Sequence, residues 1–123
     1  PGIQENVMAA TLAIDGLKAL VLETYGSGNA PSKPWFIRCL SEACAKGIVI
    51  VNVTQCNAGT VEMERYNTGY QLLQAGVVSG YDSTTESAVT KLMFLFGHGL
   101  TADAVKEHLN CSLIGEVTIR DQR

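Results

Sequence analysis

The chain has 123 residues and a formal net charge of −3, from 9 Lys and Arg residues and 12 Asp and Glu residues. The basic residues are scattered, which argues against a surface that binds nucleic acid or an acidic membrane. No apolar stretch approaches the ~20 residues that a bilayer span requires, and the 46% of residues that are hydrophobic can form a core. We therefore expect one domain over residues 1–123.

The first half of the chain alternates helical and strand patterns. Apolar residues at helical spacing predict helices, and short apolar runs between breakers predict strands. In chain order the patterns predict a helix over Gln4–Ile14, a strand over Leu17–Leu22, a helix over Lys33–Lys46 and a strand over Ile48–Val51. The second strand is continuously apolar and β-branched, as expected for a parallel strand that is covered on both faces.

The second half continues the alternation. It predicts a helix over Asn67–Ala75, a strand over Val77–Ser79, helices over Thr84–Phe96 and Thr101–Leu109, and a weakly specified strand at Glu116–Ile119. We expect the helix over Thr84–Phe96 to begin with a capping box, in which the Ser83 hydroxyl and the Glu86 carboxylate satisfy amide donors reciprocally. Thr101 is expected to cap the last helix.

This order of elements predicts an α/β fold. We expect a doubly wound, flavodoxin-like, three-layer parallel sheet with helices on both faces. A parallel sheet of this kind would normally begin with a strand, whereas the first element here is a helix that only Pro-Gly-Ile precedes. The sheet is therefore expected to lack its first strand.

Two long polar tracts follow the first two predicted strands: Glu23–Ser32 and Asn52–Thr60. Strand-to-helix connections usually take only about 2–6 residues, and α/β folds bind ligands beyond the carboxyl ends of their strands. Because both tracts would open on the same edge of the sheet, we expect a ligand site there.

Other chemistries fit the sequence less well. The segment Gly26–Pro31 resembles a dinucleotide fingerprint, but Pro31 stands where the third Gly or Ala belongs. His98 and His108 fall at predicted helix ends, so neither is expected to be catalytic. With no recognisable nucleophile–base pair, the residues alone predict a small-molecule-binding or accessory domain.

The chain contains four cysteines: Cys39, Cys44, Cys56 and Cys111. Neither a C-x-x-C motif nor paired histidines accompany them, so a zinc site is not expected. We interpret them as reduced thiols of a cytoplasmic protein, with Cys39 and Cys44 in the core. Cys56 lies in a polar tract at the expected ligand edge, where a role in packing and a role in the site both remain open.

Five segments resemble the C-terminal domain of cytoplasmic, type I L-asparaginases, in order and at matching spacing over essentially the whole chain. They are Ala19–Pro31, Gly47–Cys56, Tyr66–Gly69, Ala75–Gly80 and Thr85–Leu92. The resemblance implies that the chain is a fragment of an asparagine-hydrolysing enzyme. In this family two nucleophilic threonines, with an Asp and a Lys, lie in a larger N-terminal domain that these residues do not include. No metal or organic cofactor is implied.

The resemblance also implies an intimate dimer, or a dimer of such dimers, in which this domain completes the active site of a neighbouring subunit. Asn29 matches the position from which related asparaginases supply an Asn to that shared site, and Tyr25 and Ser27 accompany it as substrate-binding residues. An amide can donate to the carboxylate of L-asparagine and accept from its ammonium group. No nucleic acid or membrane partner is expected.

Bacterial type I enzymes can carry a second, allosteric asparagine site, for which the resemblance suggests Glu23, Thr54, Gln55 and Cys56 here. In those enzymes an Arg precedes the Tyr-Gly pair by two residues, whereas this chain has Glu23 there. An Arg can clamp a carboxylate, and a Glu would repel it. Allosteric control by asparagine is therefore doubtful.

Two other interpretations stay open. One is a free-standing amino-acid-binding or regulatory module with the same fold. The other is the asparaginase-like subunit of an archaeal glutamyl-tRNA amidotransferase.

Overall fold

The computed structural model describes residues 2–64 and 67–118 of the chain. Over these ranges the elements are α1 (Glu5–Leu12), β1 (Ala19–Thr24), α2 (Pro34–Ala45), β2 (Val49–Thr54), α3 (Asn67–Gln74), β3 (Val78–Ser79), α4 (Thr85–Gly97) and α5 (Ala102–Leu109). Each helix and each of the first three strands predicted from the sequence is present.

The three strands form one parallel sheet in the order β1-β2-β3. The pairing of β1 with β2 runs from Ala19 opposite Val49 to Thr24 opposite Thr54, so both strands end at the same level. The middle strand, β2, is buried at every position. This confirms the predicted parallel sheet, and a first strand upstream of α1 stays a prediction.

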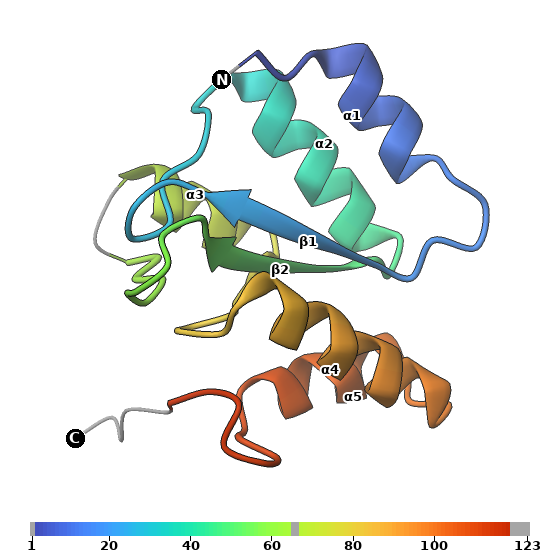
Figure 1. Cartoon of the computed structure of the whole chain (residues 1–123). Coiled ribbons are helices and arrows are strands. Elements are labelled where there is room, and N and C mark those ends of the chain that lie inside the picture. The colour runs from blue at the N-terminus through green and yellow to red at the C-terminus, as the bar shows by residue number, and fades with distance from the viewer. Residues whose placement is uncertain (1, 65–66, 119–123) are drawn as a thin grey trace.

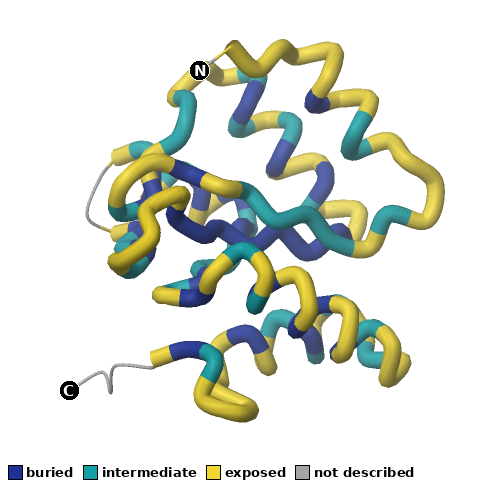
Figure 2. The backbone as a smooth tube through the Cα atoms, viewed as in Figure 1, coloured by how far each residue is buried: buried dark blue, intermediate teal, exposed yellow. Residues whose placement is uncertain are grey.

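The sheet lies between two helical layers. Helices α1 and α2 cover one face, and α4 and α5 cover the other (Figure 1). Alternate side chains of β2 enter the two cores: Ile50 packs with Phe36 and Leu40 of α2, whereas Val51 and Val53 enter the core that α4 and α5 close. In Figure 2 the buried residues therefore concentrate along β2 and on the inner faces of the helices. The predicted three-layer architecture is confirmed.

Both long strands extend further toward their carboxyl ends than predicted. β1 covers Ala19–Thr24 rather than Leu17–Leu22, and β2 continues to Thr54 rather than ending at Val51. The prediction stopped at the first polar residue of each run. The strands continue because the Thr24 hydroxyl donates to Asn52 Oδ1 at 2.6 Å, so these polar groups are buried in contact with each other.

The helix α4 begins one residue later than the predicted capping box requires. Thr84 is the N-cap, and its hydroxyl accepts a hydrogen bond from the Ser87 amide at 3.1 Å. The expected Ser83–Glu86 capping box is therefore wrong, because Ser83 is buried and its amide donates to the Gly80 carbonyl at 3.0 Å. The Thr101 cap on α5 is confirmed by a bond from the Ala104 amide at 3.3 Å.

The predicted strand at Glu116–Ile119 is wrong over its described part, residues 116–118, and Ile119 lies outside the described residues. Glu116 instead closes a local loop. Its carboxylate accepts hydrogen bonds from the Leu113 and Ile114 amides at 2.8–3.0 Å and pairs with Lys91 Nζ of α4 at 2.6 Å. Desolvation acts to raise the pKa of Glu116, but the bonds from Lys91 and the backbone amides outweigh it and lower the pKa to about 2.

All four cysteines are free thiols. Cys39 and Cys44 are half-buried against the core, as expected, and burial raises the pKa of the Cys44 thiol against the opposing effect of Lys106. Cys56 and Cys111 are exposed. None of the helices in residues 2–64 and 67–118 has the length and apolar character needed to span a bilayer.

Candidate functional site

The two polar tracts meet at the carboxyl edge of the sheet, as predicted. Thr24 and Thr54 are paired at the ends of β1 and β2, and the Gln55 amide donates to the Thr24 carbonyl at 2.8 Å. The chain leaves both strands at the same point, so residues after position 24 lie beside residues after position 54. This is the edge at which parallel α/β sheets bind ligands.

The five-residue segment Tyr25–Asn29, here called the edge loop, is a tight turn closed by its own backbone. The Tyr25 amide donates to the Asn29 carbonyl at 2.7 Å, and the Asn29 amide donates back to the Tyr25 carbonyl at 2.9 Å. Gly26 and Gly28 have φ values of +51° and +113°. The value at Gly28 lies outside the range that residues with a Cβ readily adopt, so the glycine is required for this turn.

Two contacts fasten the edge loop to the rest of the domain. The Thr54 hydroxyl at the end of β2 donates to the Gly26 carbonyl at 2.5 Å. The Glu62 amide donates to the Ser27 carbonyl at 2.8 Å. The loop is therefore held from two sides by main-chain acceptors, which leaves its side chains free for other contacts.

The three predicted substrate-binding side chains lie within this loop. Tyr25 and Asn29 are exposed and Ser27 is half-buried. Within residues 2–64 and 67–118, the Asn29 carboxamide has no hydrogen-bond partner, so both its donor and its acceptor are available. The structure thus presents a polar, amide-bearing loop on a fixed base.

A buried carboxamide beneath the loop was missed by sequence reasoning. Asn52 of β2 has no exposed surface, and its carboxamide lies between Thr24 and Gly28. Polar residues in a run of β-branched residues were interpreted as the end of the strand. A polar residue in phase with Ile50, on a strand buried on both faces, was the available signal.

The four residues of the possible effector site also lie together. The Gln55 side-chain amide donates to the Glu23 carbonyl at 3.4 Å, and the Cys56 amide donates to the Thr54 hydroxyl at 3.1 Å. The Glu23 carboxylate accepts a hydrogen bond from the Thr85 hydroxyl at 2.6 Å. Thr85 is the first residue of α4, where the helix dipole favours a negative charge. Glu23 is thus already engaged within the domain.

Two cations that could have compensated for Glu23 lie elsewhere. Lys18 precedes β1, at the opposite end of the strand, and its Nζ lies 5.6 Å from the centroid of the Phe96 ring. Arg38 of α2 pairs with Glu5 of α1 at 3.0 Å. Neither cation contributes to the carboxyl edge near Glu23.

The histidines occupy the helix ends that the sequence predicted. Nδ1 of His98 lies 2.8 Å from the Phe94 carbonyl at the end of α4, and Nδ1 of His108 lies 2.7 Å from the Ala104 carbonyl in α5. Both rings therefore contact their own helices. In the described part of the chain, neither ring makes a hydrogen bond to the edge loop.

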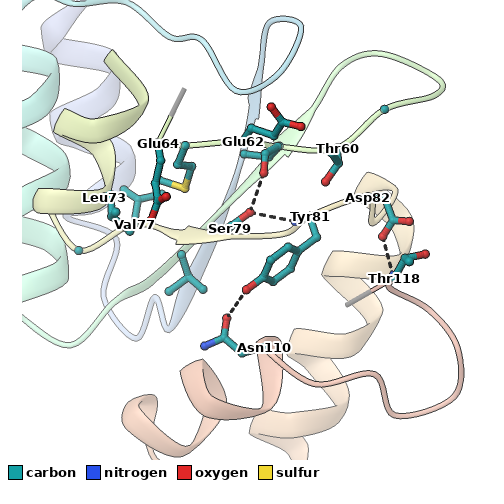
Figure 3. A pocket seen from close by; sticks show the side chains of 15 residues that line it. Thr60, Glu62, Glu64, Leu73, Val77, Ser79, Tyr81, Asp82, Asn110 and Thr118 are labelled. Carbon is teal, nitrogen blue, oxygen red and sulfur yellow. Dashed lines mark hydrogen bonds between the residues drawn. The ribbon is translucent and has the colours of Figure 1, made fainter. Parts of the chain in front are cut away.

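A groove of about 1080 Å³ lies on the β3 side of the sheet, between the segment from Gly59 to Glu64, β3 and the turn that follows (Figure 3). The Ser79 hydroxyl accepts from the Tyr81 amide at 3.1 Å, and the Tyr81 hydroxyl donates to Asn110 Oδ1 at 3.1 Å. Tyr81 has a φ of 54°, which these contacts hold. The sequence pattern did not indicate this groove, because its walls come from three separate segments.

Known proteins show where this arrangement recurs. The chain is 42% identical to L-asparaginase 1 of Escherichia coli K12 over 121 residues, which are 98% of this chain and 36% of that protein. It is 44% identical to the human 60 kDa lysophospholipase over 119 residues, which are 96% of this chain and 20% of that protein.

The crystal structure of L-asparaginase I from Vibrio cholerae matches with a TM-score of 0.87 and 42% identity, over 96% of this chain and 34% of that one. The chain thus spans about a third of the length of these asparaginases. The family model described as the glutaminase/asparaginase C-terminal domain matches residues 1–109. With that match over most of its length, the chain belongs to the glutaminase/asparaginase C-terminal domain family.

Proposed function

We propose that this chain is the smaller, C-terminal domain of an L-asparaginase that hydrolyses L-asparagine to L-aspartate and ammonia. The observation that carries the proposal is the edge loop Tyr25–Asn29, which holds an exposed carboxamide on a fixed turn beyond the carboxyl ends of β1 and β2. Carboxamides suit an amino-acid substrate because they can donate to its carboxylate and accept from its ammonium group.

In this proposal the edge loop completes the active site of a neighbouring subunit. Asn29 binds the amino-acid part of the substrate, and Tyr25 and Ser27 line the same surface. The exposure of Asn29 and Tyr25 supports this role, because side chains that complete a partner's site must face outward from their own domain. The working protein would be an intimate homodimer or a homotetramer made of two such dimers.

The rest of the machinery belongs to an N-terminal domain outside this chain. There a Thr would attack the side-chain amide of asparagine, ammonia would leave, and water would hydrolyse the acyl-enzyme. This assignment of the catalytic groups to another domain is supported by the length of an asparaginase relative, of which the match covers only 36%. We place the full-length enzyme in the cytoplasm, and we assign it no cofactor.

The second cluster, Glu23, Thr54, Gln55 and Cys56, is proposed as a remnant of an effector site. The carboxylate of Glu23 is held by Thr85 at 2.6 Å, at the place where a ligand carboxylate would need a cation. A ligand carboxylate in contact with the Glu23 carboxylate would be repelled, so we expect little binding of asparagine there.

The decisive experiment is steady-state kinetics of the full-length protein with Asn29→Ala. Loss of a hydrogen bond to a charged group costs about 1.5–3 kcal/mol, so kcat/KM for asparagine should fall roughly 10- to 150-fold. Asn6→Ala on α1 is the matched control, since Asn6 is also exposed but lies outside the carboxyl edge. Kinetics of Asn29→Ala within twofold of the wild type would overturn the proposed role of the loop.

The length of the parent polypeptide separates this proposal from its alternatives. An asparaginase parent should be about three times as long as this chain, as the asparaginase relatives are. A free-standing amino-acid-binding module would end near 13.2 kDa, the mass of this chain. A longer parent that releases no ammonia from asparagine would favour the amidotransferase subunit instead, since the match covers only 26% of that subunit from Methanobrevibacter smithii.

A further inference from the structure

Asn52 is a polar side chain at the centre of an apolar strand. It has no exposed surface, and its neighbours Val51 and Val53 are equally buried. Its Oδ1 accepts a hydrogen bond from the Thr24 hydroxyl at 2.6 Å. Its Nδ2 is buried without a hydrogen-bond partner in the described part of the chain. A buried donor without a partner is unfavourable, so its presence calls for a physical reason.

The free end of this carboxamide faces the edge loop. A Cβ built on Gly28 would lie 3.3 Å from Asn52 Nδ2 and 2.8 Å from Val61 Cγ1. Asn52 and Val61 therefore form the floor on which Gly28 rests, and no larger residue fits at position 28 without a shift. Gly28 directly precedes Asn29, so the packing of Gly28 on Asn52 and Val61 determines the position of the Asn29 side chain.

The hydrogen bonds of the edge loop also single out Gly28. Within the described residues, the carbonyl oxygens of Tyr25, Gly26, Ser27 and Asn29 each accept a hydrogen bond, and that of Gly28 does not. In the part of the chain that the structure describes, the buried side-chain donor without a partner thus lies beside the loop residue whose carbonyl has no donor.

Asn52 is also firmly anchored. It lies in the middle strand, opposite Leu22 of β1 and Ser79 of β3, and its carbonyl accepts a bond from the Gly80 amide at 2.8 Å. A side chain fixed in this way can position a loop with little freedom of its own. Displacement of a substrate-binding group by about 1 Å can reduce a reaction rate by two orders of magnitude.

We propose that Asn52 is a positioning residue that sets the place of Asn29, with Thr24 holding one end of its carboxamide and Gly28 resting on the other. This inference rests on the proposed function of the edge loop and adds a residue that acts through it. Asn52 itself does not touch the substrate. Its effect therefore appears only while Asn29 is present.

The test is a double-mutant cycle in the full-length protein. Asn52→Leu keeps the branched shape of the side chain and replaces its polar atoms with methyl groups, and the Thr24 hydroxyl keeps its second acceptor, the Val53 carbonyl at 3.2 Å. We expect about a tenfold fall in kcat/KM for asparagine in the Asn29 background and less than a twofold change in the Asn29→Ala background. Equal losses in the two backgrounds would overturn the proposal.

A second pair of variants keeps the test valid if Asn52→Leu does not fold. Thr24→Val removes the hydroxyl at nearly constant volume, and Thr24→Ser keeps it. The valine variant should lose about as much kcat/KM as Asn52→Leu, and the serine variant should stay near the wild type. The opposite order, or equal values for the two, would overturn the positioning role.

Val51→Ala is the stability control. Val51 is as buried as Asn52 but enters the core under α4 and α5, so its loss should lower the melting temperature and leave kcat/KM within twofold. An unchanged kcat/KM in Asn29→Ala would overturn the proposed role of the edge loop, on which this inference rests. A strong effect of Asn29→Ala together with a neutral Asn52→Leu would defeat only the positioning role.

Discussion

The edge loop Tyr25–Asn29 and the loop from Leu113 to Glu116 are both closed by hydrogen bonds, but different groups make those bonds. The edge loop is closed by its own backbone, with Tyr25 and Asn29 bonded amide to carbonyl, and its polar side chains face outward. The second loop is closed by the Glu116 side chain, which turns inward to the Leu113 and Ile114 amides and to Lys91.

The difference concerns which groups remain for a ligand. The Glu116 carboxylate closes its own loop, so it is not available for a ligand. The side chain that this loop exposes most, Ile114 at 91%, is apolar. The edge loop needs no side chain for its own closure, because Gly26 and Gly28 permit the turn and the backbone supplies the bonds. A loop that is closed by its backbone leaves its Asn side chain available for a ligand.

The largest expected effect on catalysis comes from breaking the backbone turn. Gly28→Ala places a Cβ 2.8 Å from Val61 Cγ1, at a φ of +113° that alanine rarely adopts. The loop must move, so kcat/KM of the full-length protein should fall about 100-fold or more.

Gly26→Ala is the matched control in the same loop. Gly26 has a φ of +51°, inside the small left-handed region, and a Cβ there meets no atom within 4 Å. We expect a loss of less than tenfold. If the two alanine variants have similar kinetics, the close fit of Gly28 on its floor has no part in function.

The sequence predicted the architecture because the layers depend on patterns that a single segment carries. Burial could be predicted within single segments. Examples are the apolar stripe of Phe36, Leu40 and Ala43 on α2 and the continuous apolar run at Ile48–Val51. The carboxyl edge could be located for the same reason, since the length and glycine content of Glu23–Ser32 are local properties.

The rest depends on contacts between distant segments. Thr24 and Asn52 are buried because each satisfies the other across 28 positions, and a pattern within one segment cannot show this. The strand expected at Glu116 fails for a similar reason: the ion pair with Lys91 lies 25 positions away and favours a closed loop. Likewise, the floor under Gly28 exists only once β2 and Val61 have come together.

At the loop that the Glu116 side chain closes, the expected effect is on local stability and not on catalysis. Glu116→Gln in the full-length protein leaves the buried Lys91 without its counter-ion, and breaking such a pair costs about 3–5 kcal/mol. Hydrogen exchange at the Leu113 and Ile114 amides should accelerate strongly. The kinetics for asparagine should stay within twofold, because this loop is not part of the carboxyl edge.

The pH dependence of this exchange follows from the depressed pKa of Glu116, about 2 against an ordinary value of 4.5. Above the ordinary value the closed loop has the full benefit of the ionised carboxylate, and that benefit is lost as the pH falls toward 2. Protection of the two amides, corrected for intrinsic exchange, should be flat above about pH 5 and decline below it. A decline that persists unchanged in Glu116→Gln would assign it to other groups.

The smallest expected effect concerns Glu23, which precedes the edge loop and whose carboxylate is bound by Thr85 at the start of α4. We expect the wild-type, full-length protein to show hyperbolic kinetics over a wide range of asparagine concentrations. An effector must bind two states of an enzyme with different affinity, and here a carboxylate meets any incoming ligand carboxylate. Glu23→Gln keeps an acceptor for Thr85, so kcat/KM should change by less than twofold.

Glu23→Arg tests whether the charge at position 23 is what prevents effector binding. An Arg supplies the planar donors that a ligand carboxylate prefers, beside Thr54, Gln55 and Cys56, which already lie together. If those three residues retain the rest of the pocket, this variant should become sigmoidal. A Hill coefficient of about 2 in the wild type would instead mean that Glu23 turns from Thr85 to the ammonium group of the effector. The carboxylate at position 23 would then be part of a working switch, available for a ligand in the same sense as the Asn29 amide.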